Sequence, residues 1–251
     1  MQILVDIGSS TVKACALEAG KLQVLKTKSV PFKKSYREDS GNEAGVAFEV
    51  IDQNAESRYL ELALAGRYNG KEPVLLINIG GESTELVVLE EGKGTFRQNL
   101  DVGVGTILAA FPTINHEISE VTLDEAVAYI SKILPSIQIG AAFAIYSGGE
   151  LSYMRLTGYA LVPNTRFMDS DHPSIISDTD FIARNREIFE KVRLSAPEAL
   201  MPENPSWMHG ARACSALAQA ICTTYNIREI VPSNSNLLDG VARSLSETIL
   251  T

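Results

Sequence analysis

The chain has few cysteines, no long apolar run and a deficit of positive charge, and each shortage excludes a class of protein. Its 251 residues contain three cysteines (Cys15, Cys214 and Cys222), an odd number without metal-ligand spacing. Reduced, mostly buried thiols are expected, as in a cytoplasmic protein. No stretch approaches the ~18 uncharged apolar residues of a membrane-spanning helix. No basic segment precedes the first apolar strand, so no signal peptide is predicted.

Acidic residues outnumber basic ones, giving a formal net charge of −9, which argues against general nucleic-acid binding. The cations are concentrated in residues 13–37, where seven Lys and Arg oppose one Glu. That segment carries +6 and the remainder of the chain −15. A solvated strand face explains the basic segment, and a track for a polyanionic substrate is the alternative. The apolar fraction of 45% is typical of a globular protein, and the length suits two modest subdomains.

Residues 73–90, PVLLINIGGESTELVVLE, organise the rest of the chain. They predict a buried strand over Val74–Ile79, a turn at Gly80 and Gly81, and a second strand over Glu85–Leu89. Adjacent glycines let the backbone approach a ligand closely, because no Cβ is in the way. Backbone N–H groups in such a turn converge on an anion, and a nearby carboxylate holds a cation beside it. An ordinary hairpin in an α/β core is the alternative explanation.

A second copy of this pattern favours the functional interpretation. Residues 3–16, ILVDIGSSTVKACA, give an apolar strand with Asp6 near its end, a turn at Gly8 and then hydroxyl side chains. A third glycine pair, at 148–149, follows the apolar run at 141–146. Two strand–turn–strand phosphate loops followed by a glycine pair resemble the actin, hexokinase and heat-shock ATPase superfamily. That resemblance implies two duplicated subdomains with phosphate and metal in the cleft between them.

Four segments resemble, more narrowly, the exopolyphosphatase and guanosine-pentaphosphate phosphohydrolase family. VLLINIGGESTELVV resembles its DIGGGSTEL signature, and DIGSSTVK resembles its DIGSNSVR opening. Residues 48–60, FEVIDQNAESRYL, resemble its EVISGEEEARL segment, which aligns Glu56 and Arg58 with the family's Glu and Arg. Residues 230–240, IVPSNSNLLDG, resemble its closing SDxGLREG segment. The four segments follow the family's order from the first strand to the last helix.

The resemblance implies an α/β chain with the two-subdomain, actin-like (ribonuclease H-like) ATPase fold. Residues 1–72 and the C-terminal helix 237–251 are expected to form subdomain I, and residues 73–236 subdomain II. The relatives place a long helix–strand–helix section between the first loop and the EVI segment, where this chain has only residues 14–47. An abbreviated N-terminal subdomain is therefore expected.

The resemblance also implies the residues of the site. Glu56 is expected to take a proton from the attacking water, although a carboxylate in the first turn of a helix is also stabilised by the helix dipole. Asp6, Asn78 and Glu85 are expected to hold Mg²⁺, directly or through water, since hard oxygen ligands suit that ion. The expected phosphate-binding residues are Gly8, Ser9, Ser10, Lys13, Arg58, Gly80, Gly81, Ser83, Gly148 and Gly149.

Two positions depart from the family's signature. Its Asp at the second loop is Asn78 here, which removes a negative charge from a metal site. Its third glycine is Glu82, which adds an anion where a phosphate approaches. Three functions stay open: a phosphoanhydride hydrolase of reduced activity, a polyphosphate- or nucleotide-binding regulator, and an ATPase activator of the same superfamily.

The hydrolase interpretation implies Mg²⁺-dependent release of terminal phosphate from polyphosphate or guanosine pentaphosphate. Cleavage of a phosphoanhydride needs charge neutralisation and an oriented nucleophile, and little covalent work from the protein. The expected partners are polyphosphate or a phosphorylated guanosine nucleotide, with no membrane and no general nucleic acid. A homodimer is left open.

The rest of the chain alternates strands and helices. Polar loops are predicted over Lys33–Gly45 and Pro163–Asp178, with His172 on the surface of the second loop. Cys214 and Cys222 are expected to pack in the core. A helix capped by Asp52 or Asn54 is predicted to run to about Ala65. Further helices are predicted over Thr122–Leu134, Leu151–Leu161, Thr179–Leu194, His209–Tyr225 and Leu237–Leu250.

Overall fold

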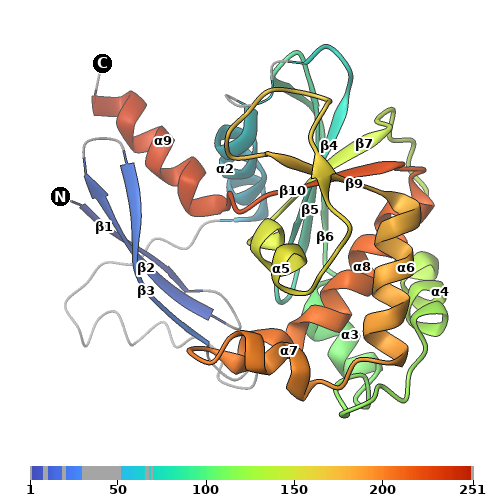
Figure 1. Ribbon diagram of the computed structural model, residues 1–251. Coiled ribbons are helices and arrows are strands. Elements are labelled where there is room, and N and C mark those ends of the chain that lie inside the picture. The colour runs from blue at the N-terminus through green and yellow to red at the C-terminus, as the bar shows by residue number, and fades with distance from the viewer. Residues whose placement is uncertain are drawn as a thin grey trace.

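The computed structural model describes residues 2–7, 11–18, 21–29, 52–65, 68 and 70–249, which form two sheets and the helices around them (Figure 1). The predicted loop over Lys33–Gly45 and the glycine and serines of the first turn, Gly8, Ser9 and Ser10, lie outside the described residues. The strands are β1 (Gln2–Ile7), β2 (Thr11–Glu18), β3 (Lys21–Ser29), β4 (Val74–Ile79), β5 (Thr84–Glu90), β6 (Lys93–Leu100), β7 (Phe143–Ser147), β8 (Val162–Pro163), β9 (Ser174–Ser177) and β10 (Glu229–Pro232). The helices are α2 (Gln53–Ala65), α3 (Val104–Ala110), α4 (Leu123–Ile133), α5 (Glu150–Leu156), α6 (Asp178–Glu190), α7 (Ser195–Leu200), the 3₁₀ helix η1 (Pro205–Gly210), α8 (Ala211–Thr224) and α9 (Leu237–Ile249).

The small sheet has the order β1-β2-β3 and is antiparallel, as the alternating pattern at the start of the chain predicts. Its first hairpin pairs Gln2 with Leu17 and runs up to Ile7 opposite Val12. In this register Asp6 lies opposite Lys13. The first predicted phosphate turn therefore connects two paired strands, as the motif requires.

The large sheet has the order β6-β5-β4-β7-β10-β9-β8. Its strands β4, β7 and β10 are parallel, and β5, β6, β9 and β8 each pair antiparallel. The interior strand β4 is almost wholly apolar because both of its faces are covered. Leu75 and Ile77 pack in the core that includes α8, whereas Val74 and Leu76 pack in the core that includes α2.

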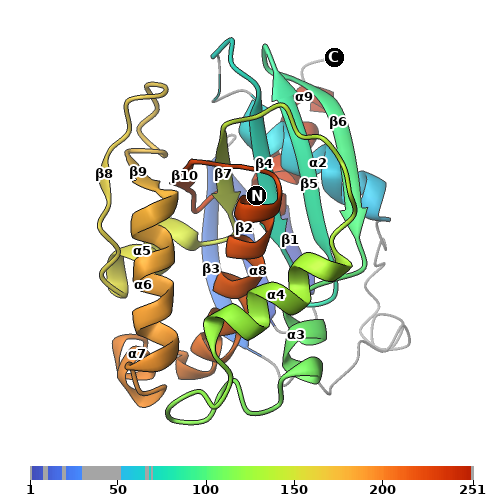
Figure 2. The same cartoon turned by 90° about the vertical axis from the view of Figure 1, so that its right-hand side faces the viewer.

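Helices cover both faces of the large sheet. Figure 2 shows α3, α4, α6 and α8 in front of the sheet, with α2 and α9 behind it. Helix α4 begins as predicted at Thr122, whose hydroxyl accepts the N–H of Glu125 while the Glu125 carboxylate accepts the N–H of Thr122. Of the two predicted caps of helix α2, Asp52 is the one that acts, because its carboxylate accepts the N–H of Ala55 at 2.8 Å. These layers confirm the predicted α/β fold.

Helix α9 packs along α2 and lies beside β3 of the small sheet (Figure 1). The close approach to α2 depends on Gly240, since a Cβ there would lie 1.9 Å from the carbonyl oxygen of Tyr59. The Arg243 guanidinium adds a hydrogen bond of 3.0 Å to the carbonyl of Leu62. Helix α2 itself packs on the large sheet through Leu60 and Leu64. Because α2 and α9 link both sheets, the division of the chain at residue 72 stays a prediction.

The predicted polar loop over Pro163–Asp178 was wrong in part. It includes the end of β8 and all of β9, and these strands extend the large sheet beyond β10. His172, expected on the surface, has no exposed area. A two-residue and a four-residue strand are too short for a periodic pattern, so the polar composition concealed them.

The helical predictions failed mainly at helix ends. Helix α5 ends at Leu156 and not at Leu161, because a turn with Gly158 at φ +77° follows it. Helices α7 and η1 were not predicted, and α7 buries none of its residues, so it lacks the apolar stripe that sequence reading relies on. Cys222 is buried as expected, and Cys214 is half-buried against the same core. Of the helices that are described, none is long and apolar enough to cross a membrane.

Candidate functional site

A row of polar side chains crosses the large sheet at the end of its parallel strands. The strand registers pair Asn99 with Glu85, Glu85 with Asn78, and Asn78 with Ser147. Paired residues point to the same face, and this face is the one that α2 covers, since it continues from Val74 and Leu76. The carboxyl ends of parallel strands are the usual place for ligand sites in α/β sheets.

The centre of the row is a buried cluster around the Glu85 carboxylate, which is 1% exposed. Its Oε2 accepts the side-chain N–H of Asn78 at 2.7 Å, and its Oε1 accepts the hydroxyl of Ser83 at 2.7 Å. The Ser147 hydroxyl donates to the carbonyl of Ile77 at 3.1 Å and lies 3.4 Å from the Asn78 Oδ1. The two predicted metal ligands Asn78 and Glu85 are therefore in direct contact.

The second glycine turn, Gly80 to Ser83, is closed by a hydrogen bond of 2.8 Å from the Gly80 N–H to the Ser83 carbonyl. The carbonyls of Gly80 and Gly81 accept the N–H groups of Val104 and Gly105, at 3.0 and 2.6 Å. Within the described part of the chain, the N–H groups of Gly81 and Glu82 have no hydrogen-bond partner. Those two amides are the ones that this turn presents for an anion.

Two residues that the sequence did not single out hold this turn in place. A Cβ on Gly103 would lie 2.6 Å from the nitrogen of Glu82 and from the carbonyl group of Gly81, so the turn packs directly on the backbone before α3. The Thr84 hydroxyl donates to the carbonyl of Val102 at 2.6 Å. The glycine-rich run VGVGT (residues 102–106) was the available signal in the sequence. Its glycines are needed because they pack on the backbone of the second glycine turn, which is distant in sequence.

Glu82 is exposed, and its side chain lies against Gly105 at the start of α3, where a Cβ would be 3.2 Å from Oε1. The side chain therefore leans across the turn towards α3. The carboxylate adds negative charge beside the amides of the second glycine turn. Repulsion of an incoming phosphate by this charge stays a prediction.

The third glycine turn differs from the expected phosphate cradle. The N–H of Gly148 donates to the carbonyl of Ser235 at 3.1 Å, and the N–H of Gly149 donates to the carbonyl of Ser233 at 3.3 Å. Both amides are thus engaged by the loop between β10 and α9. Gly148 has φ +119°, and no described atom lies within 4 Å of the place where its Cβ would be. An approach of phosphate to Gly148 and Gly149 stays a prediction, but it cannot use these two N–H groups as they are bonded here.

Helix α2 brings Glu56 to the same end of the sheet. The Ser57 hydroxyl donates at 2.6 Å to the Oδ1 of Asn99, the residue opposite Glu85. The Gln53 side chain donates at 3.1 Å to Asp101, just after β6. Glu56 lies half-buried in the first turn and Arg58 is exposed. Hydrogen bonds from Gln53 and Ser57 therefore hold the start of α2, which carries Glu56, close to the Asn99 end of the polar row. The role of Glu56 as the base stays a prediction.

Around the first glycine turn, the structure describes only the pairing of the two strands that it joins. Asp6 and Lys13 lie opposite each other in the β1–β2 ladder, at its end towards the turn. The placement of their side chains falls outside what the structure describes. Their assigned roles stay predictions, as do those of the turn residues between them.

The chemistry of the donors fits Mg²⁺, because a carboxylate, an amide oxygen and a hydroxyl are hard oxygen ligands. Among the described side chains no three His, Cys, Asp or Glu residues gather at one point. The described part of the site supplies one carboxylate, Glu85, and the amide oxygen of Asn78. Asp6, waters and phosphate oxygens would have to complete the coordination.

Directly after the third glycine turn, a second buried carboxyl group was missed by sequence reading. Glu150 is 8% exposed, and burial raises its pKa to about 8. Its Oε1 lies 4.0 Å from the Cys214 sulfur, which lies 2.8 Å from the hydroxyl of Tyr146. Because its pKa is about 8, Glu150 holds its proton at neutral pH. Burial also raises the pKa of the Cys214 thiol, so this cysteine is not a nucleophile at neutral pH.

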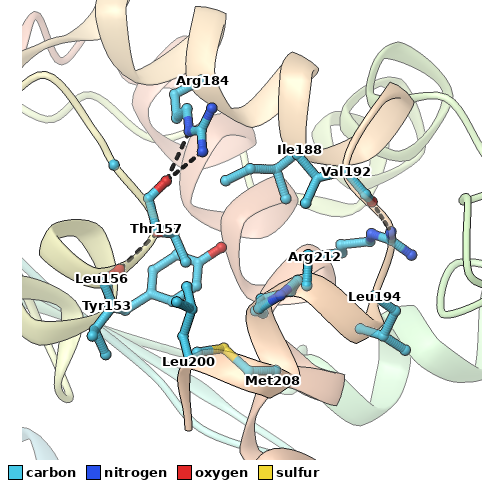
Figure 3. Close-up of a pocket in the computed structure, with 14 residues that line it drawn as sticks. Tyr153, Leu156, Thr157, Arg184, Ile188, Val192, Leu194, Leu200, Met208 and Arg212 are labelled. Carbon is cyan, nitrogen blue, oxygen red and sulfur yellow. Dashed lines mark hydrogen bonds between the residues drawn. The ribbon is translucent and has the colours of Figure 1, made fainter.

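A cavity of about 310 Å³ lies away from the polar row, between α5, α6, α7, η1 and α8 (Figure 3). Its wall is mainly apolar, with Leu156, Ile188, Leu200 and Met208 around it. The Arg212 side chain at its edge donates to the carbonyls of Ile114, His116, Glu117 and Val192. None of the predicted site residues lines this cavity.

The comparisons with known proteins agree with the resemblance. The model of the Ppx/GppA phosphatase family matches residues 33–147, which include Glu56, Asn78 and Glu85. The Ppx/GppA family member of Aquifex aeolicus has a TM-score of 0.73 and 16% identity, covering 98% of this chain and 97% of its own. An exopolyphosphatase from Cytophaga hutchinsonii has a TM-score of 0.72 and 12% identity, covering 98% and 97%.

An exopolyphosphatase-like protein has a TM-score of 0.71 and 15% identity, covering 98% of this chain and 98% of its own. No curated protein sequence matches the chain. At these identities the solved structures establish a shared fold. The expected resemblance to the Ppx/GppA family is confirmed over residues 33–147, and nearly the whole chain shares the fold of the solved Ppx/GppA structures.

Proposed function

Because a Ppx/GppA family segment spans residues 33–147 and the fold of that family extends over nearly the whole chain, we propose that this protein is a phosphoanhydride hydrolase. Its proposed reaction releases the terminal phosphate from polyphosphate or guanosine pentaphosphate. The observation that carries the proposal is the polar row Asn99–Glu85–Asn78–Ser147, with the first turn of α2 hydrogen-bonded to its end. The row and its bond to α2 bring the recognised segments 48–60 and 74–88 together at one edge of the sheet, beside the strand that leads to the third glycine pair.

The proposed division of labour follows from the geometry. The amides of Gly81 and Glu82 bind phosphate oxygens, since they have no partner within the described residues and project from a tight turn. Glu56 acts as the general base and takes the proton from the attacking water, a role that a positioned carboxylate can fill. The Ser83 hydroxyl fixes the orientation of the Glu85 carboxylate through their 2.7 Å hydrogen bond.

Mg²⁺ is the proposed metal, held by Glu85 and Asp6 with the oxygen of Asn78 beside them. When bound, it would neutralise charge on the phosphate oxygens. Glu85, Asp6 and Asn78 would hold the metal in one position, with one arrangement of ligands. Asn78 contributes an oxygen without a charge, so weaker Mg²⁺ binding is expected than with two or three carboxylates.

A catalytically weak, ligand-binding regulator is the second candidate, and one observation favours it. The Asn78 amide donates to the Glu85 carboxylate, so the pair is stable without a cation. Together with the exposed carboxylate of Glu82, this arrangement lowers the rate expected of the hydrolase. An ATPase activator remains a third candidate, which no described feature favours.

The test is a phosphate-release assay with tripolyphosphate, long polyphosphate and guanosine pentaphosphate, with and without Mg²⁺. Glu56→Gln is expected to lower the rate by about 10²–10⁴-fold, the usual contribution of a general base. Glu90→Gln, an exposed glutamate at the end of β5, is the matched control and should keep the wild-type rate. An unchanged rate in Glu56→Gln would remove Glu56 from the mechanism. A wild type that binds these ligands without releasing phosphate would favour the regulator.

A further inference from the structure

His172 is fully buried between two hydrogen-bonding partners. Its Nδ1 lies 2.8 Å from the Oδ2 of Asp169, and its Nε2 lies 2.8 Å from the hydroxyl of Ser233. Antiparallel pairing explains the meeting, because β9 aligns Ile176 with Ile230 and each step along β10 moves one step back along β9. The residues just before β9 therefore lie beside Ser233, just after β10.

A neutral His172 imidazole makes both of these hydrogen bonds, one to Asp169 and one to Ser233. The Ser233 oxygen accepts the N–H of Ser235 at 3.0 Å, so with a neutral imidazole the Ser233 O–H donates to the His172 Nε2. The Nδ1–H of His172 then donates to the Asp169 carboxylate. Neither Ser233 nor His172 has any exposed area, so no substrate reaches the serine oxygen and the group is not a nucleophilic triad.

The loop that carries Asp169 and His172 is itself tightly held. The second carboxylate oxygen of Asp169 accepts the N–H of Asp171 at 3.0 Å. The Asn164 side chain donates to the His172 carbonyl at 2.8 Å, and the Asn164 N–H donates to the Pro173 carbonyl at 3.0 Å. Asp169 and His172 are therefore a fixed support and not a mobile contact.

Ser233 transmits this support to the third glycine turn. Its carbonyl accepts the N–H groups of Gly149 and Glu150, at 3.3 and 3.1 Å. Its own N–H donates to the carbonyl of Tyr146 at 2.8 Å, one residue before Ser147 in the polar row. Every polar atom of Ser233 is thus engaged, either with the support or with the turn.

We propose that Asp169, His172 and Ser233 are positioning residues that hold the third glycine turn, and with it the Ser147 end of the polar row. The link from this turn to phosphate rests on the proposed function. The positioning itself rests on the hydrogen bonds alone. This positioning role explains why a histidine is buried at a place where an apolar side chain would also fill the space.

The first measurement is amide hydrogen exchange followed by mass spectrometry. His172→Gln and Ser233→Ala should each speed exchange in the peptide over 147–152 by about 10-fold, because a buried partner is lost. Asp169→Asn should have a smaller effect, since its amide oxygen still accepts the Nδ1–H. His116→Gln, which alters an exposed histidine paired with Glu120, is the control and should leave this peptide unchanged.

The second measurement is calorimetric binding of tripolyphosphate, with steady-state phosphate release beside it. His172→Gln should weaken binding and raise KM by about 10-fold, with a smaller change in kcat, since a misplaced contact affects ligand positioning. Asp169→Asn should retain most of the wild-type affinity.

The outcomes separate the two proposals. Unchanged exchange over 147–152 in both His172→Gln and Asp169→Asn would overturn the positioning role, whatever the activity. Faster exchange with unchanged affinity and KM would also overturn it, since the turn would then be held without consequence for the ligand. A wild-type protein that neither binds nor cleaves any polyphosphate would overturn the proposed function, while local exchange would still decide whether the three residues hold the turn. If His172→Gln does not fold, Asp169→Asn and Ser233→Ala carry the test.

Discussion

The side-chain amide of Asn78 donates a hydrogen bond of 2.7 Å to the carboxylate of Glu85, where the resembling family has two carboxylates. The pair is buried, with Glu85 1% exposed. An amide next to a carboxylate is stable without a cation, whereas two adjacent carboxylates repel one another. This single substitution therefore changes what the site needs in order to fold and what it needs in order to bind metal.

Asn78→Asp should lower the melting temperature in the absence of divalent cations, because it places two carboxylates in contact in a buried site. The expected cost is on the order of 1–3 kcal/mol. Added Mg²⁺ should recover the loss by binding the folded state. Thermal unfolding with and without Mg²⁺ measures both effects. Asn226→Asp, the same change at an exposed turn, is the control. Full stability without Mg²⁺ would show that the pair does not depend on the amide.

Restoring both departures decides between hydrolase and regulator. The double variant Asn78→Asp with Glu82→Gly keeps the net charge, adds a carboxylate near the proposed metal and removes one from the turn. A slowed hydrolase should then release phosphate faster and need less Mg²⁺, by phosphate-release assay at graded Mg²⁺. Turnover that stays at background while calorimetry detects ligand would instead support the regulator.

The buried carboxyl of Glu150 should make stability depend on pH. Its pKa rises from 4.5 to about 8 on folding because burial disfavours the charged form. The folded state therefore binds this proton more tightly, and the stabilisation is fully present below about pH 4.5 and lost as the pH rises towards 8. Glu150→Gln has no proton to lose.

The wild type should thus lose stability relative to Glu150→Gln between pH 5 and 8, by an amount on the order of 1–4 kcal/mol. Urea unfolding at several pH values measures the difference. Glu90→Gln, at an exposed position, should show no such widening. A constant difference across this range would contradict the assignment.

Gly240→Ala should destabilise the protein, although alanine favours helices by about 1 kcal/mol over glycine. The added Cβ would lie 1.9 Å from the backbone oxygen of Tyr59, so α9 must move away from α2. Overpacking of this kind costs about 1–3 kcal/mol. Gly140→Ala is the control, because no described atom lies within 4 Å of its Cβ position. Equal urea midpoints for the two variants would contradict a tight α2–α9 contact.

The basic segment leads to a prediction about salt. If Lys26, Lys28, Lys33 and Lys34 follow a polyanion, the affinity for long polyphosphate should fall as salt rises, since exposed charges are screened over about 8–10 Å at 0.1–0.15 M. Binding assays between low and moderate salt measure this fall. The quadruple Lys→Gln variant should show a flatter salt dependence. Equal slopes for the two proteins would return these lysines to a solvated strand face.

Much of the site was predictable because its residues lie within continuous segments. The strand Val74–Ile79 was predicted at both ends, since an apolar run that stops at Gly80 has only one natural boundary. Asp52 was one of two predicted helix caps, the other being Asn54, because such a side chain acts within three residues of its own position. Patterns of this kind need no knowledge of distant residues.

The use of the third glycine turn was not predictable in the same way. The pattern SGGE is compatible with free amides, but the amides of Gly148 and Gly149 donate to a loop more than 80 residues further along the chain. His172 was misplaced on the surface for a related reason. Its neighbours in sequence are polar, whereas its side chain lies against Ser233, just after β10, and against the buried ring of Phe167.

The sequence by itself determined the α/β alternation, the two glycine turns with their acidic and amide residues, and the resemblance that links them to a phosphatase family. Those features depend on hydrophobic period, on turn chemistry and on short motifs, all of which act over a few residues. The tertiary structure alone decided that Asn99, Glu85, Asn78 and Ser147 form one row, that Gly240 and Gly103 have no room for a side chain, and that Ser233 engages the third turn. Strand register and close backbone approach join residues that are far apart in the chain, and only the packed fold brings them together.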